Sequence, residues 1–348
     1  MSQVAPKRDS TKTIVANRLT ALEQKDRPLA PTDRPRISDL PEKRRREHDA
    51  PLHHLDKKDV HPSTRPARGE SRPYINWPVV FWIGVLHIGA LAAPFFFSWQ
   101  AVVLVFALHW LTGGIGICLG FHRMITHTSF QTYRPVRWLI ALIGGLAGEG
   151  SVLDWVSNHR KHHAYSDQPE DPHSPHDGGF WSHMLWLFYM SSGEAHQKHV
   201  ERWSPDLLKD PGMRWIGAMF LPTNVVLGLS LMAIGYGIGG WYMAMSFLTW
   251  GMFVRMCFVL HSTWFVNSAS HMWGYRNYVT TDDSRNNWWV ALVSYGEGWH
   301  NNHHAYPRMA PHGHRWWEVD MTFATIRLMQ FFGLAWDVVD YKRGGKAE

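Results

Sequence analysis

Two long stretches without a charged side chain constrain the fold of this chain more than any other feature of its sequence. No Asp, Glu, Lys or Arg occurs over the 47 residues from Ile75 to Phe121, or between Trp215 and Val254. A helix needs about 20 apolar residues to cross the hydrocarbon core of a bilayer, so the first stretch can hold two spans. Helices of soluble proteins usually carry charges on one face. Two buried hairpins in a soluble protein are therefore the weaker alternative.

The positions of the charges predict the topology. Four spans are expected, at about residues 76–97, 101–121, 215–236 and 241–263. The connections at Ser98–Gln100 and Gly235–Gly240 contain no Lys or Arg, whereas the segments 122–214 and 264–340 contain many. Positively charged loops remain on the cytoplasmic side of a membrane. We therefore predict an all-α integral membrane fold with four transmembrane helices in two hairpins. The charged segments form a cytoplasmic helical cap, and both termini are cytoplasmic.

Residues 1–72 differ in composition from the rest of the chain. They contain 17 Lys or Arg and 11 Asp or Glu, whereas residues 73–348 contain 18 of each charge. The net charge of +6 therefore lies in residues 1–72. A segment with so little apolar surface cannot offset the entropy lost on ordering. We expect a disordered basic tail at 1–72 and a membrane domain at 73–340.

Histidines gather in four short clusters, which lie at the cytoplasmic ends of the predicted spans or in the predicted cap. The clusters are His122-Arg-Met-Ile-Thr-His127, His159-Arg-Lys-His162-His163, Asn267-Ser-Ala-Ser-His271 and His300-Asn-Asn-His303-His304. Positions i, i+3 and i+4 share one face of an α-helix, so the second and fourth clusters can each direct three imidazoles to one point. Each buried polar group without a partner costs about 1–3 kcal/mol, and metal ions would supply the missing partners.

The first and third clusters differ in geometry. His122 and His127 are five residues apart, which separates them by about 140° around an α-helix. They converge on one metal only if the helix ends or frays between them, or if the metal lies beside the helix end. His271 follows Asn267 by about one helical turn, which brings the carboxamide beside the imidazole.

The donor set restricts the metal. Imidazole suits Zn, Cu, Fe and Ni, and nine histidines are enough for two ions. Two zinc ions would favour hydrolysis, whereas two irons would favour oxygen activation. The surrounding sequence is apolar and aromatic, which favours oxidation of an apolar chain by a di-iron centre. His87, His109 and His261 occur singly on apolar faces and are interpreted as core residues with ordinary partners.

Several segments together resemble the membrane-bound fatty-acyl Δ9 desaturases of the stearoyl-CoA desaturase type. They are Gly120-Phe-His-Arg-Met-Ile-Thr-His127, Asp154-Trp155 with His159–His163, Trp264–His271, Gly296–His304 and Trp316–Asp320. The similarity extends from about Trp77 to Trp336 and is strongest to the bacterial and plastid acyl-lipid branch. It implies an oxidoreductase with two irons that uses O2 and two electrons to insert a cis double bond into a saturated acyl chain.

The resemblance also implies roles for individual residues. Ligands of one iron are expected at His122, His127, His159, His163 and His304. Ligands of the other are expected at His162, His271, His300 and His303. Asn267 corresponds to a residue that reaches the second iron through a water molecule. No catalytic side chain is expected beyond the di-iron centre.

Two further groups of residues are expected around the irons. Carboxylates orient metal-bound imidazoles through hydrogen bonds, and the candidates near the clusters are Asp154, Asp167, Asp171 and Glu297. Helix capping or a surface position is the alternative for each. Related enzymes close the acyl tunnel at the levels of the second span that Trp110 and Gly114 occupy. The expected tunnel residues are Trp110, Gly114, Trp155 and Trp264, with ordinary helix packing as the alternative for Gly114.

Two absences bear on the substrate and the electron donor. Animal acyl-CoA desaturases carry an Arg-Asp pair immediately before the HxxHH motif, where this chain has Ser157 and Asn158. This difference favours an acyl-lipid substrate over acyl-CoA, although Arg160, Lys161, Arg255 or Arg276 could hold CoA differently. The chain contains no His-Pro-Gly-Gly signature of a fused cytochrome b5. A separate donor, ferredoxin or cytochrome b5, is therefore expected, and no nucleic acid.

Two other functions are considered. A fatty-acyl hydroxylase could use the same di-iron scaffold, because hydroxylation and desaturation diverge only after the first hydrogen abstraction. A metal-transport membrane protein would need ionisable groups along its spans. The first apolar stretch contains only His87 and His109, so transport is the remote alternative.

Overall fold

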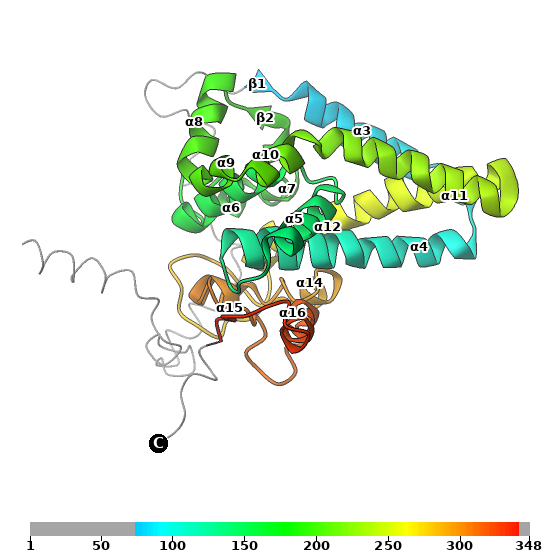
Figure 1. Ribbon diagram of the computed structural model, residues 1–348. Coiled ribbons are helices and arrows are strands. Elements are labelled where there is room, and N and C mark those ends of the chain that lie inside the picture. Colours follow the sequence, from blue (N-terminus) through cyan, green and yellow to red (C-terminus); the bar gives the residue numbers. More distant parts are fainter. Residues whose placement is uncertain (1–73, 341–348) are drawn as a thin grey trace, which may run out of the picture.

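The computed structural model describes residues 74–340, so the tail predicted at residues 1–72 lies outside the described residues. Figure 1 shows long helices extending to one side of a cluster of shorter helices. Within residues 74–340 nearly all regular structure is helical, as the sequence predicts. The exception is a small antiparallel pair, β1 (Tyr74–Ile75) and β2 (Tyr189–Met190). This pair joins the start of the first long helix to the cluster of shorter helices.

The first helical hairpin comprises α3 (Trp77–Ala90), the 3₁₀ helix η2 (Ala93–Phe96), α4 (Trp99–His109) and the π-helix η3 (Trp110–Thr126). The side chains of Asn76 and Ser98 accept hydrogen bonds from backbone N–H groups at the starts of α3 and α4, which fixes where these helices begin. Together α4 and η3 form one apolar helix of 28 residues, long enough to cross a membrane.

The second hairpin begins with α11 (Phe220–Leu248) and continues through the π-helix η6 (Thr249–Val254), α12 (Arg255–Asn267) and the short α13 (Ala269–Met272). The backbone leaves the helical conformation at Gly239 and Gly240, inside the predicted connection, and Gly240 has a φ of 66° that favours glycine. A Cβ atom on Gly235 would lie 2.4 Å from the carbonyl oxygen of Met243. The two halves of α11 are therefore in close contact on either side of the turn.

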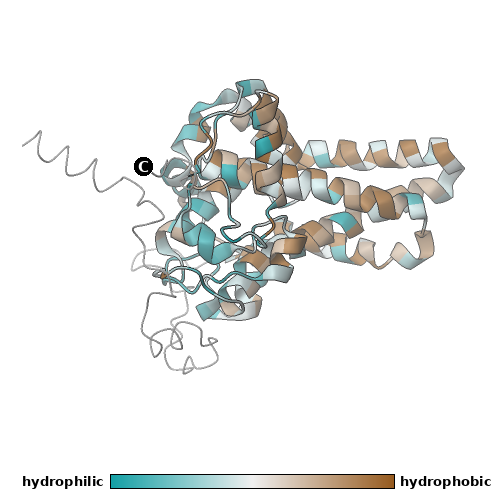
Figure 2. Ribbon diagram, turned by 90° about the horizontal axis from the view of Figure 1, so that it is seen from below, coloured by the Kyte–Doolittle hydropathy of each residue, from teal (hydrophilic) through white to brown (hydrophobic). Residues whose placement is uncertain are grey.

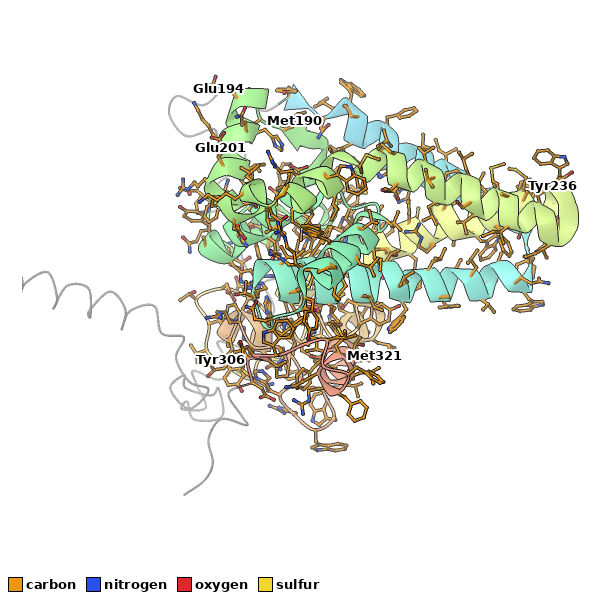
Figure 3. All side chains as sticks on the ribbon, viewed as in Figure 1. Met190, Glu194, Glu201, Tyr236, Tyr306 and Met321 are labelled. Atoms are coloured by element: carbon orange, nitrogen blue, oxygen red, sulfur yellow. The ribbon has the colours of Figure 1, made fainter. Side chains whose placement is uncertain are left out.

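The remaining helices form the cluster at the other end of the molecule. They are α5 (Arg134–Gly145), α6 (Val152–Tyr165), η4 (Pro175–Asp177), α7 (Gly179–His183), η5 (Leu185–Phe188), α8 (Gly193–Trp203), α9 (Pro205–Lys209), α10 (Pro211–Ala218), α14 (Trp288–Val293), α15 (His300–Ala305) and α16 (Met321–Phe331). Figure 2 shows more hydrophilic residues in this cluster than along the long helices. In Figure 3, Tyr236 marks the far end of the long helices, opposite Met190, Glu194 and Glu201.

Close packing of η3 against α5 positions the end of η3. A Cβ atom on Gly116 would lie 2.6 Å from the Cα atom of Gly144, and one on Gly144 would lie 2.4 Å from the ring of Phe121. Small residues of this kind allow two helix backbones to approach each other. Phe121 and Ile140 are buried in the same core. This contact holds the residues that follow Phe121 at the centre of the helical cluster.

Candidate metal centre

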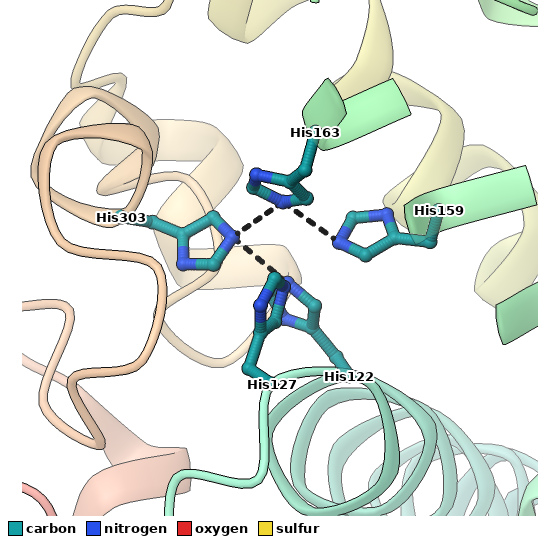
Figure 4. A group of neighbouring side chains, drawn as sticks. All are labelled: His122, His127, His159, His163 and His303. Carbon is teal, nitrogen blue, oxygen red and sulfur yellow. Dashed lines mark hydrogen bonds between the residues drawn. The ribbon is translucent and has the colours of Figure 1, made fainter. Parts of the chain in front are cut away.

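The nine clustered histidines meet in two buried groups. The first group contains His122, His127, His159, His163 and His303, and the second contains His162, His271, His300 and His304. Within each group, one ring nitrogen of every residue lies within 4.8 Å of those of the others. Figure 4 shows the first group, in which imidazoles from η3, α6 and α15 point toward one another.

The structure exchanges the places that the sequence analysis assigned to His303 and His304. The Nε2 atom of His303 lies 3.1 Å from that of His122, so His303 belongs to the first group. His304 packs against His300 in the second group, and their ring centroids are 4.3 Å apart. Residues i and i+4 lie about 40° apart around a helix, closer than i and i+3. Each HxxHH motif therefore gives its first and last histidine to one group and its middle histidine to the other.

The wider winding of η3 explains how His122 and His127 converge. The backbone N–H of His127 donates to the carbonyl oxygen of His122 at 3.1 Å, which is the i to i+5 bond of a π-helix. Residues five apart consequently lie on nearly the same side of the helix. The ring centroids of His122 and His127 are 4.8 Å apart. The helix also ends after Thr126, as one of the geometric alternatives requires.

Carboxylates bind the Nδ1 atoms of four imidazoles, one in the first group and three in the second. The pairs are His122 with Glu297 at 2.6 Å, His162 with Asp171 at 3.0 Å, His271 with Asp167 at 3.0 Å, and His304 with Asp282 at 2.8 Å. An Nδ1–H that donates to a carboxylate leaves Nε2 with a free lone pair and fixes the ring orientation. The four rings therefore present Nε2 to the centre of their group.

Three of the four carboxylates named from the sequence occupy these positions, and Asp154 does not. Asp154 lies in the first turn of α6, where it contacts Ser151 at 2.6 Å and His196 at 3.1 Å. Helix capping is the alternative role that the sequence analysis gives for Asp154. Asp282 was missed because it lies 22 residues before His304 in the chain, and no local spacing connects the two. Only the presence of acidic residues near the third cluster could have suggested it.

Buried Arg123 and His312 contact the carboxylate that binds His122 of the first group. Arg123 is fully buried and donates to Glu297 Oε1 at 2.9 and 3.0 Å and to Asp320 at 2.8 Å. The second carboxylate oxygen of Glu297 contacts His122 and, at 3.0 Å, His312 Nδ1. Burial raises the pKa of Glu297, but Arg123 and the two imidazoles outweigh it and hold the pKa well below its usual value. His312 was also missed by the sequence analysis, because it stands outside every cluster.

Burial lowers the pKa of several grouped histidines, whereas at His271 the carboxylate of Asp167 outweighs burial and raises the pKa to about 9. For His127, His159 and His163, burial and then the neighbouring imidazoles lower the pKa well below its usual value. Burial and neighbouring imidazoles have the same effect on the pKa of His300 and His303. These rings are therefore neutral, which is the state that binds a metal.

The geometry of the ring nitrogens fits two metal ions. The Nε2 atom of His163 lies 3.0 Å from that of His303 and 3.1 Å from that of His159. The Nε2 atoms of His271 and His300 are 3.1 Å apart. Two nitrogens that each lie about 2.1 Å from one ion, at a right angle, are about 3 Å apart. The buried Nε2 atoms of His127, His162 and His304 have no hydrogen-bond partner among residues 74–340. A metal ion in each group would supply the missing partner.

Four histidines of the described residues that lie outside the two groups, His87, His109, His183 and His261, have other partners. His109 is hydrogen-bonded to Tyr295 at 2.5 Å and to Ser262 at 3.2 Å. His261 lies between His87, at 3.1 Å, and His183, at 2.9 Å. These contacts agree with the interpretation of His87, His109 and His261 as core residues with ordinary partners.

A cavity of about 1850 Å³ adjoins both groups. Its walls include His122, His159 and His300, and also Trp155 and Trp264, two of the four expected tunnel residues. The indole of Trp155 stacks on the ring of His159, with centroids 4.9 Å apart. Asn267 lines the same cavity near His300.

The other two expected tunnel residues lie outside this cavity lining. Gly114 packs against Trp110 and Tyr295, since a Cβ atom on Gly114 would lie 3.2 Å from each of these side chains. The cavity reaches η3 one turn nearer the histidines, at Ile117 and Cys118. Gly114 therefore stands just beyond the end of the cavity.

Glu149 is a half-buried acid in the cavity wall that the sequence analysis did not identify. Its carboxyl group accepts hydrogen bonds from Trp155 Nε1 at 2.8 Å and from Thr263 Oγ1 at 2.9 Å. Burial raises the pKa of Glu149 to about 7, although both hydrogen bonds oppose the shift. The group is therefore neutral below neutral pH and ionised above it.

The sequence of this chain matches a family model. The model for fatty acid desaturases covers residues 97–329, which contain all nine clustered histidines. The chain belongs to the fatty acid desaturase family. It is 47% identical to an sn-2 palmitoyl-lipid 9-desaturase of Nostoc over 275 residues, covering 79% of this chain and 93% of the relative.

Two other desaturases show the range of substrates among the relatives. An sn-1 stearoyl-lipid 9-desaturase of Anabaena variabilis is 47% identical over 77% of this chain and 95% of its own length. An acyl-CoA C20 Delta5-desaturase of Anemone leveillei is 40% identical over 74% of this chain and 80% of its own length.

A histidine at the centre of the first group tests the proposed metal ligands. We expect His303→Ala to lower the iron content of the purified desaturase and to reduce turnover more than about 100-fold. This loss should be larger than the effect of removing an outer hydrogen-bond partner. His196→Ala is the matched control for metal content, because His196 lies outside both histidine groups and its half-exposed side chain pairs with Asp154. Normal iron content in the His303→Ala protein would contradict the ligand assignment.

Glu149 predicts a pH dependence of substrate binding. Above about pH 7 its ionised carboxylate would face the apolar chain, so the KM should rise by up to about tenfold per pH unit. Glu149→Gln remains neutral and should remove this rise. The measurement is KM between about pH 6 and pH 8.5, with Glu170→Gln as a control from the same cavity lining. The same pH profile in Glu149→Gln and wild type would show that another group titrates.

Proposed function

We propose that this desaturase is an integral membrane di-iron enzyme that inserts a cis double bond at Δ9 of a saturated acyl chain carried by a lipid. The observation that carries the proposal is the pair of buried imidazole groups beside one large cavity. Relatives at 47% identity that are named acyl-lipid 9-desaturases support the substrate class and the position.

Two irons are the proposed metals. The first would be held by His122, His127, His159, His163 and His303, and the second by His162, His271, His300 and His304. Asn267, at the end of α12, is proposed to reach the second iron through water. When bound, the irons would supply the activation of O2, which with two electrons and two protons takes two hydrogens from the chain and is reduced to two molecules of water.

The side chains of the protein prepare this reaction without taking part in it. Carboxylates keep the rings oriented, and Arg123 keeps Glu297 in place beside His122. Trp155 covers His159 on the cavity side and forms a rigid wall against which an acyl chain can lie. A dry wall of this kind also keeps water away from the reacting carbons.

The membrane arrangement is part of the proposal. The spans would be α3, the joined α4 and η3, and the two halves of the second hairpin on either side of Gly239–Gly240. Many side chains on these helices are apolar and exposed, among them Phe81, Trp99, Val226 and Trp241. Lipid would cover them, because an apolar surface of this extent is unfavourable in water. The helical cluster and both termini would be cytoplasmic, and residues 73–340 would form the membrane domain.

The contacts around the second histidine cluster support a lipid substrate over acyl-CoA. Ser157 is hydrogen-bonded to Ser204 at 2.7 Å, and the Oδ1 atom of Asn158 is hydrogen-bonded to His199 at 3.0 Å. Arg160 is bound to Asp206 at 2.6 and 3.0 Å. Arg255 is buried and donates to the carbonyl oxygens of Gly251 and Leu146. Most of the side chains considered as binding groups for CoA are thus already bound to other groups of the protein.

The electron donor is proposed to be a separate protein, ferredoxin or cytochrome b5. The chain carries no haem-binding signature of its own, as noted above.

Expression in a desaturase-deficient bacterium tests the function. We expect palmitoyl or stearoyl chains of membrane lipids to gain a cis double bond at Δ9, as the names of the relatives indicate. Mass spectrometry that locates the double bond is the measurement, and the His303→Ala variant at equal membrane level is the control. Hydroxylated chains without unsaturated ones would instead identify a hydroxylase.

The position of Gly114 beyond the end of the cavity predicts an effect on chain length. A phenyl group there would crowd Tyr295 and Trp110 and fill the space next to the end of the cavity, so Gly114→Phe should favour shorter chains. Trp110→Ala should admit longer ones. Competition among myristoyl, palmitoyl, stearoyl and arachidoyl chains is the measurement, with the exposed Phe106→Ala as control. Unchanged selectivity in active variants would place the end of the tunnel elsewhere.

A further inference from the structure

The large cavity has a second boundary that faces outward from the helical bundle. Its lining includes Phe81 and Val85 of α3 and Leu221 at the start of α11. The same side chains are 73%, 37% and 54% exposed, respectively. Residues that line a cavity and also form part of the outer surface mark an opening. This opening is distinct from the polar part of the cavity lining at Ser191 and Glu194.

The packing of α3 and α11 explains where the opening lies. Farther from the helical cluster, η6 contacts both helices: a Cβ atom on Gly89 of α3 would meet the ring of Phe253, and one on Gly228 of α11 would lie 3.7 Å from Met252. Pro78, Phe81 and Val85 precede this contact on α3, and they follow helical spacing along one face. The opening is therefore confined to the ends of α3 and α11 nearest the helical cluster (Figure 1).

Aromatic side chains stand between the opening and the histidines. Trp82 of α3 contacts Phe220 of α11 with ring centroids 6.1 Å apart, and its Nε1–H donates to the carbonyl oxygen of Gly148 at 3.1 Å. The same lining includes Trp264, Trp155 and His159, and Trp155 stacks on His159. A path lined mainly by apolar and aromatic groups thus joins the outer surface of the bundle to the first histidine group.

The chemistry of the lining identifies the occupant. The lining residues of α3 and α11 include no charged side chain, whereas the lining on the side of the helical cluster includes Lys161, Lys198 and Arg202. Val85 lies eight residues after Trp77, about 12 Å along the helix axis, which is within one leaflet of a bilayer. An apolar chain can pass such an opening while a polar head group remains at the end nearer the charged residues.

We propose that the opening between α3 and the start of α11 is a side portal for the acyl chain of a membrane lipid. The chain enters from the adjacent leaflet, and the rest of the lipid stays in the bilayer. This inference rests on the proposed function in one respect, namely that the substrate is a lipid-linked chain. It adds the route by which that chain reaches the histidines.

Thiol labelling of the folded enzyme tests the portal. Val85→Cys and Leu221→Cys place a thiol at the portal, and purified active protein is treated with a bulky maleimide before reconstitution into saturated lipid vesicles. Labelled protein should lose desaturation about tenfold or more, because a bulky group there obstructs the chain. Iron content and the double-bond position in the residual product should remain unchanged. Activity before labelling shows that each variant is folded.

Matched variants separate the portal from other effects. Ile88→Cys and Val225→Cys lie on the same two helices, are exposed, and do not line the cavity, so labelling should leave their activity unchanged. Labelled wild type accounts for the half-buried Cys257. Equal activity of the labelled portal and control variants would overturn the portal. So would a loss confined to labelled Ser191→Cys, because the chain would then enter at the polar side. A wild type that desaturates no lipid would overturn the proposed function itself.

Discussion

The interior of this protein depends on holding nine imidazoles in two groups, with ring nitrogens that lie within 4.8 Å of one another and in several pairs only 3.0–3.1 Å apart. Lone pairs at that separation repel one another unless a cation or a proton lies between them, and each buried polar group without a partner costs about 1–3 kcal/mol. The nitrogen separations of 3.0–3.1 Å within each group match two metal ions. Four carboxylates bind the Nδ1 atoms of four rings, and buried Arg123 neutralises part of the negative charge of these carboxylates. The helical cluster is organised around this requirement.

The same requirement explains the unusual winding of η3. A π-helix is less favourable than an α-helix and occurs mostly at functional sites. In η3 it extends over Trp110–Thr126 and brings His122 and His127 to one side. The close contact between Gly116 and Gly144 holds η3 against α5. The long helix therefore both crosses the apolar part of the molecule and supplies two rings to the first group.

The cavity connects this centre to two chemically different surroundings. Toward the helical cluster its lining is charged, and toward α3 and α11 it is apolar and aromatic. Such a gradient suits a substrate with a polar head and a long apolar chain. Glu149 is part of this lining and is hydrogen-bonded to Trp155, and burial raises its pKa to about 7.

Much of this protein follows from local sequence, because covalent geometry sets the helical period. Charge-free stretches indicated the long helices, Gly235–Gly240 contains the observed reversal, and the spacing of the histidines indicated which residues meet. The same period, applied to i and i+4, would have placed His303 and His304 correctly. The sequence did not reveal the π-winding of η3, the pairing of Asp282 with His304, the place of His312 beside Glu297, or Glu149 in the cavity wall. These depend on packing between segments far apart in the chain, for which no spacing rule exists, so only the tertiary structure decides them.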